Sequence, residues 1–460
     1  MSPFHIGMTH TIKGSLNLTA LEQSLNSIIE RHVCLRSAIV QNGDLSAEER
    51  EVRIHNLATS QAVDSGLYSQ HIVDCVPLQI EMHFLEPLDS EEQRSEMENI
   101  STASISEPFD YSIPPFMRVH LFRLSNDQYR LVLILQHLIC DMHSLVILYQ
   151  ELKLFYDSIV SNVVPQLPPI KHNFMDFALE QHQQAKNNKF DKSIQYWRDQ
   201  LIQFGAAQPI LADLPPAFRG HMDPMDPEMG VLELPLDEEL LDHWESYGRK
   251  QKMSLYTVYI AACMILFRKC KAENAIAIWS NFANRTNPNY LNSIGSFGNS
   301  HLLGIELLDT ITLSDALMMI RTVVLNAIAN QNVPLPLVLN KLDPLPRLRG
   351  VQVVCDMIQT NRSGGPKYNS KYVTFTQEPL PAYLLSGWSE GLTISLWHYG
   401  SSGRLSATFS KRRIADEGAF NLLNAIKNTI SWCVENKDKR IMDYNFKTAG
   451  VNTKYPQSAQ

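Results

Sequence analysis

Apolar residues recur along the chain with two different periods, which together predict a mixture of helices and strands. Leu21, Leu25 and Ile28 follow one another at three- and four-residue spacing, and this spacing predicts a helix over residues 17–32. By contrast, Leu131 to Leu135 form an unbroken apolar run. Such a run is typical of a strand that is buried on both faces, here residues 128–136.

The same patterns extend through the rest of the chain. They predict strands at residues 9–13, 80–85, 117–124, 275–278, 301–307, 351–358, 393–399 and 404–409, and helices at 190–204, 238–250, 255–270 and 415–435. No regular repeat of 20–50 residues joins these elements, so we expect a layered α/β (α+β) architecture rather than a solenoid.

A proline-rich stretch marks the expected domain boundary. A single core stops growing near about 250–300 residues, so a chain of 460 residues is expected to fold as two lobes. Pro165, Pro168 and Pro169 lie in residues 161–170, which we interpret as an extended connector. We therefore expect an N-terminal domain of residues 1–165 and a C-terminal domain of residues 166–460.

His137 lies between a predicted strand and a predicted helix. The buried strand ends at Gln136, and Asp141 and Ser144 offer side-chain oxygens that can cap a helix. Leu145, Leu148 and five further residues then form one apolar stripe: Tyr149, Leu152, Phe155, Tyr156 and Ile159. His137 is therefore expected on a strand-to-helix turn.

Charge, cysteine content and termini narrow the classes of function. There are 40 basic and 48 acidic residues, giving a net charge of -8 without long blocks of one sign, which argues against a nucleic-acid partner. No signal peptide or membrane-spanning run is found, so we expect a cytoplasmic protein with no membrane partner. The seven cysteines show no Cys-x-x-Cys spacing, and lone histidines such as His143, His301 and His398 predict no metal site.

Several short motifs occur in a fixed order. Gln136-His137-Leu138-Ile139-Cys140-Asp141-Met142-His143-Ser144 is preceded by Arg31-His32-Val33-Cys34-Leu35-Arg36. It is followed by Asn173-Phe174-Met175-Asp176-Phe177-Ala178, Ala283-Asn284-Arg285, Ile294-Gly295-Ser296-Phe297-Gly298-Asn299 and Asn330-Gln331-Asn332-Val333-Pro334. In this order they resemble the condensation domains of nonribosomal peptide synthetases and their His-x-x-x-Asp acyltransferase relatives. The likeness covers nearly the whole chain.

The resemblance implies both a fold and a catalytic centre. It implies two chloramphenicol-acetyltransferase-like lobes arranged as a V-shaped pseudo-dimer with a central tunnel. His137 is the implied catalytic residue, supported by Gln136 and by a structural ion pair between Asp141 and Arg285. The motif positions also give three candidates for residues that line the substrate tunnel: Met142, Ser144 and Asn299.

The implied reaction is the transfer of an acyl group. A stand-alone condensation domain is expected to join an acyl or aminoacyl thioester, held on the phosphopantetheine arm of a separate carrier protein, to an amine or hydroxyl acceptor. The product is an amide or an ester of a nonribosomal peptide or a related natural product. No tightly bound cofactor is implied.

Two alternatives stay open beside this interpretation. One is a non-catalytic, condensation-like docking module, because Gln136 and Met142 replace the His and Gly of the family's motif and the family's first block is not found before Pro3. The other is a His-x-x-x-Asp acyltransferase that uses coenzyme A thioesters. An epimerisation domain and a heterocyclisation domain are disfavoured, since their own motifs are replaced at residues 281–285 and 136–137.

Overall fold

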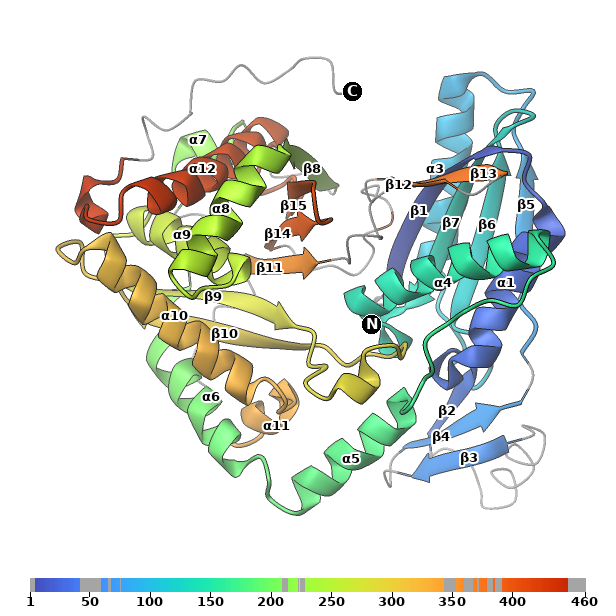
Figure 1. The fold of residues 1–460 in the computed structure, drawn as a ribbon, viewed down its shortest axis with the longest axis horizontal. Coiled ribbons are helices and arrows are strands. Elements are labelled where there is room, and N and C mark those ends of the chain that lie inside the picture. Colours follow the sequence, from blue (N-terminus) through green and yellow to red (C-terminus); the bar gives the residue numbers. More distant parts are fainter. Residues whose placement is uncertain are drawn as a thin grey trace. The chain divides into compact units, whose positions relative to one another are not determined.

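A computed structural model of the chain describes residues 5–41, 59–64, 68–74, 76–208, 214–221, 223, 228–342, 353–359, 367–369, 372–378, 384 and 391–445. The chain forms two compact units (Figure 1). The first comprises Met1–Asn187, Arg285–Phe297 and Pro366–Trp388, and the second comprises Asn188–Asn284, Gly298–Gly365 and Ser389–Gln460.

This division differs from the boundary expected at residue 165. The proline-rich connector does lie outside helices and strands, but the next helix, α5 (Phe174–Lys186), still belongs to the first unit. Tyr290, in a later segment of the same unit, donates a 2.8 Å hydrogen bond to Glu180 of α5. Two later segments thus return to the first unit, which no local pattern in the sequence indicated.

A six-stranded sheet is the centre of the first unit. Its strands are β1 (His5–Gly14), β5 (Glu81–Phe84), β6 (Met117–Arg123), β7 (Gln128–Gln136), β12 (Lys367–Asn369) and β13 (Val373–Gln377), in the order β12-β13-β1-β7-β6-β5. Only β5 and β6 pair in parallel; the other neighbours are antiparallel. A small second sheet has the order β2 (Ser37–Gln41), β4 (Tyr68–Val73), β3 (Thr59–Asp64).

Strand β7 is buried on both faces, as its apolar run predicts. Leu131, Leu133 and Leu135 belong to one hydrophobic cluster, whereas Val132 and Ile134 belong to another. Successive side chains of a strand point to opposite faces, so the two clusters are the two sides of one sheet. Helices α1 (Leu18–Arg31) and α4 (Met142–Val160) pack in the first cluster.

Helix α3 (Ser90–Ser106) lies against β6 and β7 and contributes Ile105 to the second cluster. Periodicity did not predict this helix, because few of its residues are apolar and only Ser101, Ser104 and Ile105 are buried. A capping box between Asp89 and Glu92 starts it, so its signal was local hydrogen bonding rather than amphipathicity.

The second unit also contains a six-stranded sheet. Its order is β10 (Asn299–Glu306), β9 (Ala275–Phe282), β11 (Val353–Gln359), β14 (Leu392–His398), β15 (Gly403–Ser410), β8 (Met229–Leu236). The helices of this unit are α6 (Asp191–Phe204), α7 (Pro216–Arg219), α8 (Glu238–Lys250), α9 (Leu255–Lys269), α10 (Leu313–Asn330), α11 (Leu335–Leu339) and α12 (Asp416–Glu435). Every helix and strand expected in this unit is confirmed; α10 and β8 were not expected.

Two expectations about chemistry concern the whole chain. Within the described ranges, no helix has both the length and the apolar character needed to cross a bilayer. Six cysteines in those ranges are free, namely Cys34, Cys140, Cys263, Cys270, Cys355 and Cys433, and Cys75 lies outside the described residues.

Candidate active site

His137 lies where strand β7 ends in the first unit. A single 3-10 turn, His137–Ile139, follows the strand and leads to α4. The imidazole is half-buried, whereas Leu138 beside it is exposed. Because β7 lies at the centre of the sheet, its end gives the histidine a rigid support.

Gln136 holds this turn in place with its side chain. The amide oxygen of Gln136 accepts a 2.6 Å hydrogen bond from the backbone N–H of Leu138, and its amide nitrogen donates to the Tyr111 hydroxyl at 2.8 Å. Cys34 and Cys140 also approach the turn, with Sγ–O distances of 3.4 Å to Ile139 and 3.6 Å to Gln136. The residue that departs from the family's motif therefore caps the turn.

Asp141 is the N-cap of α4 and the partner of Arg285. Its carboxylate accepts hydrogen bonds from the backbone N–H of Ser144 at 2.8 Å and from that of Phe297 at 3.1 Å. Arg285 donates to both carboxylate oxygens, at 2.7 Å from Nη1 and 3.1 Å from Nη2. This bidentate, charge-assisted contact is the strong form of such a pair, and both side chains are buried.

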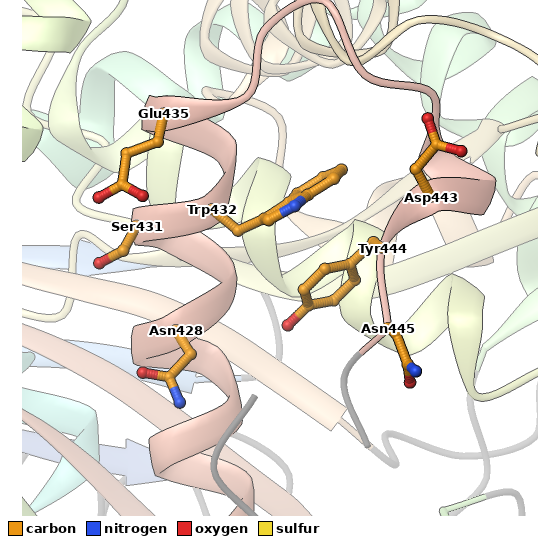
Figure 2. A pocket seen from close by; sticks show the side chains of 7 residues that line it. All are labelled: Asn428, Ser431, Trp432, Glu435, Asp443, Tyr444 and Asn445. Atoms are coloured by element: carbon orange, nitrogen blue, oxygen red, sulfur yellow. The ribbon is translucent and has the colours of Figure 1, made fainter. Parts of the chain in front are cut away.

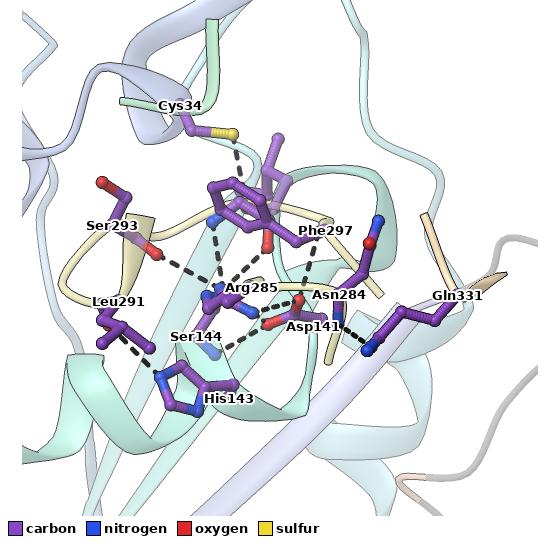
Figure 3. A network of polar contacts seen from close by, with 12 residues as sticks. Cys34, Asp141, His143, Ser144, Asn284, Arg285, Leu291, Ser293, Phe297 and Gln331 are labelled. Carbon is purple, nitrogen blue, oxygen red and sulfur yellow. Dashed lines mark hydrogen bonds and ion pairs between the residues drawn. The ribbon is translucent and has the colours of Figure 1, made fainter. Parts of the chain in front are cut away.

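Ser144 links α4 to the segment Arg285–Phe297 of the same unit (Figure 3). Its hydroxyl lies 2.8 Å from both Asp141 Oδ1 and the carbonyl oxygen of Gly295, and it accepts from the Gly295 N–H and Arg285 Nη2 at 3.0 Å. A Cβ atom on Gly295 would overlap the ring of Phe174, so only glycine allows this approach.

The ion pair controls the protonation of Asp141. Burial acts to raise the pKa of this carboxyl group, but the charge of Arg285 and the hydrogen bonds from Arg285 and Ser144 outweigh burial, and the pKa is lowered. Asp141 is therefore ionised at neutral pH. With its oxygens occupied by these donors, it acts as a structural carboxylate beside the histidine.

His137 has the opposite balance. Burial lowers the pKa of its imidazole, and neither a hydrogen bond to its own backbone nor the negative charge of Asp141 fully offsets this effect. At pH 7 the ring is therefore mainly neutral and has a lone pair that can accept a proton. A neutral imidazole on a rigid turn is chemically suited to general-base catalysis.

The structure gives the other candidates different surroundings. Met142 is the first residue of α4 and packs, partly buried, against the first hydrophobic cluster. Asn299 belongs to the second unit, where its amide donates to the carbonyl oxygens of Gln331 at 2.8 Å and Val333 at 3.2 Å. His143, interpreted as structural, lies with Nε2 at 3.2 Å from the carbonyl oxygen of Leu291.

Sequence reasoning missed a second buried charge network on α4. Glu151 lies 3.0 Å from Arg31 Nε and 2.8 Å from His32 Nε2, and His32 Nδ1 accepts from the N–H of Ile294 at 3.3 Å. Arg31 was expected to fix the end of the first helix, but its partner was not identified. The available signal was a single glutamate next to the apolar stripe of α4, between Leu148 and Leu152.

A pocket of about 310 Å³ lies in the second unit, between α12 and the residues that follow it (Figure 2). Its lining residues are Asn428, Ser431, Trp432, Glu435, Asp443, Tyr444 and Asn445. None of these belongs to the motifs described above. The pocket has no residue in common with the candidate active site.

The sequence of residues 2–363 matches the family model described as "Condensation domain". The chain belongs to this family. Among curated relatives, the condensation domain is 26% identical over 344 residues to a component of the linear gramicidin synthase of Brevibacillus parabrevis, a match that covers 74% of this chain and 4% of that protein. The chain thus corresponds to a small part of this relative.

Solved structures confirm the expected chloramphenicol-acetyltransferase-like fold. The starter condensation domain of rhizomide synthetase, in complex with C8-CoA, superposes with a TM-score of 0.73 at 12% identity, covering 96% of this chain and 93% of that one. The X-domain of teicoplanin biosynthesis, in complex with OxyB, gives 0.70 at 18% identity, covering 96% and 91%. The V-shaped arrangement of the lobes and its tunnel stay predictions.

We predict that Asp141→Ala and Arg285→Ala each lower the free energy of unfolding by about 3–5 kcal/mol, because each leaves a buried charge without its partner. The double variant is expected to lose far less than the sum of the two. Urea denaturation of the four proteins measures the cycle. Losses that simply add would show that the two charges do not stabilise the fold as a pair.

The lowered pKa of Asp141 also predicts how its contribution changes with pH. A carboxyl group with a depressed pKa stabilises the folded state above its unfolded pKa, near 3.8, and this contribution is lost as the pH falls through the folded value. The difference in unfolding free energy between wild type and Asp141→Asn should therefore be constant from pH 7 to pH 5 and shrink towards pH 3. Asp199→Asn, which changes an exposed carboxylate of α6, is the control. A difference that stays the same at pH 3 would contradict the assignment.

Proposed function

We propose that the chain is a catalytically active condensation domain. It joins an acyl or aminoacyl group, delivered as a thioester on the phosphopantetheine arm of a carrier protein in trans, to an amine or hydroxyl acceptor. The observation that carries this proposal is the mainly neutral imidazole of His137 on a turn fixed by Gln136, next to the Asp141–Arg285 ion pair.

The residues of the turn suggest how the reaction proceeds. The acceptor nitrogen or oxygen attacks the carbonyl carbon of the thioester, and His137 takes the proton that the acceptor loses or holds the attacking atom in place. The C–S bond then breaks, and the thiolate leaves with a proton. General-base assistance contributes roughly 10²–10⁴-fold in rate, and holding two reactants together can contribute as much or more.

The other members of the site have positioning roles in this proposal. Asp141 and Arg285 fix the start of α4 and therefore the turn before it, and Gln136 fixes the turn itself. Ser144 is fully buried, so its support comes through Asp141 and Gly295. Met142, which is half-buried, and Asn299 remain the proposed tunnel residues.

Two alternatives have specific support. The teicoplanin X-domain is solved in complex with another protein, OxyB, which favours asking whether this chain only docks a partner. The rhizomide starter domain is solved with C8-CoA, which favours asking whether coenzyme A thioesters serve as donors. The chemistry of the turn supports catalysis over docking, because a docking module needs no basic imidazole.

We predict that His137→Ala lowers kcat by at least about 10²-fold without lowering the melting temperature, because it removes a proton acceptor rather than a core contact. The wild-type rate should fall as the pH drops through a value below 6.5, the ordinary imidazole value, because protonation removes the base. His137→Ala should lack this acidic limb.

His243→Ala, which removes an exposed histidine of α8, is the matched control and should keep the wild-type rate and profile. A His137→Ala variant with near wild-type turnover would refute the catalytic assignment and favour the docking module. A variant that is slow but keeps the acidic limb would assign positioning, rather than proton transfer, to His137.

We predict that an acyl group on a holo carrier protein is used with a kcat/KM at least about ten-fold above that of the same acyl group on coenzyme A, a difference of about 1.4 kcal/mol in transition-state binding. Carrier contacts of this transient kind are small, below about 1,200 Å², and weaken as salt screens their charges. Intact-mass detection of product with both donors, at low and high salt, measures the ratio. Equal use of both donors at both salt concentrations would favour the coenzyme A-dependent enzyme.

A further inference from the structure

Three side chains that can bind a metal converge at the edge of the first unit's sheet. Glu81 and His83 lie on β5, the edge strand, and their two-residue spacing places them on the same face. His120 lies on the neighbouring strand β6, directly opposite Glu81 in the parallel register. Local sequence did not indicate a site here, because its third member comes from another strand.

The distances between the three side chains suit a small divalent cation. His83 Nε2 lies 3.2 Å from His120 Nδ1, and His120 Nδ1 lies 3.3 Å from Glu81 Oε2. All three candidate ligand atoms lie within 4.8 Å of one another. Ligands bound at about 2.0–2.1 Å to a tetrahedral zinc ion are about 3.4 Å apart, so two of the three spacings already match, and the exposed Glu81 side chain can close the third.

Hydrogen bonding alone does not satisfy this cluster. If His120 Nδ1 has a proton, this one proton faces acceptors on both Glu81 and His83. If Nδ1 has none, its lone pair faces the carboxylate oxygen of Glu81, and the two repel each other. A cation at the centre would use the lone pairs of all three groups at once.

The surroundings of the cluster fit a ligand set. His120 Nε2 lies 2.8 Å from the Ser104 hydroxyl of α3, and a second hydrogen bond of this kind orients histidines that bind metals. The His83 ring stacks on Phe122 at 4.7 Å, which restricts its rotation. The carboxylate of Glu96 on α3 also acts on the charge of His83 and can supply a fourth ligand.

One positive charge nearby opposes a cation, and it is already bound. Arg118 acts on the charge of His120, but its guanidinium donates to the carbonyl oxygens of Ser104 and Glu107 at 2.9 and 2.8 Å. It also lies 3.8 Å from the carboxylate of Glu107. These contacts offset its charge, and the exposed Glu81 leaves the cluster open to solvent.

We propose that Glu81, His83 and His120 form a binding site for a divalent cation of the zinc class, with water or Glu96 as the fourth ligand. Bound metal would tie the short edge strand β5 to β6. The site lies in strands β5 and β6, apart from the turn that holds His137, so the inference does not depend on the proposed acyl transfer.

The test is zinc binding by the full chain without a histidine tag, after metal has been removed with a chelator. Titration of the protein with Zn²⁺ in competition with a chromophoric zinc indicator should reveal one tight site, and Zn²⁺ should raise the melting temperature. His83→Gln and Glu81→Gln should each weaken this site by at least about ten-fold, as losing groups of a metal site commonly does. Both variants change half-buried or exposed side chains, so they are expected to fold.

Matched controls and a spectroscopic readout complete the test. Glu98→Gln and His243→Gln change exposed residues of α3 and α8 and should leave zinc affinity unchanged. Co²⁺ in place of Zn²⁺ should give the intense visible bands of four-coordinate cobalt in wild type and lose them in His83→Gln. If wild type binds no stoichiometric Zn²⁺, or if His83→Gln and Glu81→Gln bind it as tightly as wild type, the proposal is wrong.

Discussion

The buried ion pair between Asp141 and Arg285 is the contact on which the first unit depends most directly. Its members lie 144 residues apart in sequence, yet Asp141 also caps α4. One carboxylate therefore sets both the start of a helix and the position of the later segment Arg285–Phe297. Burying two charges is costly unless they are well paired and hydrogen-bonded, and here donors from Arg285, Ser144 and Phe297 all meet at this carboxylate.

This constraint reaches His137 through the backbone. Strand β7 is buried on both faces and cannot shift without exposing apolar side chains in one cluster or the other. Asp141 fixes the start of α4 only four residues after His137. The turn between them is held at both ends, and Gln136 adds a side-chain hydrogen bond inside it. A catalytic group gains from such support because small displacements reduce its rate enhancement.

Buried polar groups elsewhere in the first unit follow the same rule, with one informative contrast. Glu151 is compensated by Arg31 and His32, as a buried carboxylate requires. The cluster of Glu81, His83 and His120 instead directs lone pairs at one another without enough protons to separate them. The first arrangement is complete as protein, whereas a cation would complete the second.

The sequence alone determined the elements whose signals are local. The period of Leu21, Leu25 and Ile28 predicted α1, the apolar run of β7 predicted a strand buried on two sides, and the ordered motifs indicated the family and His137 as its candidate base. These features depend on residues within one helix, strand or turn. Helix α3 was missed because its residues are mostly polar and its start depends on a capping box.

Only the tertiary structure decided which distant segments meet. It showed that Arg285–Phe297 and Pro366–Trp388 return to the first unit, that Glu151 is the partner of Arg31, and that the Gln136 side chain caps the turn. It also brought His120 next to Glu81 and His83. Most of these contacts join residues from different elements, and their positions follow from sheet order and helix packing, which no local pattern of residues encodes.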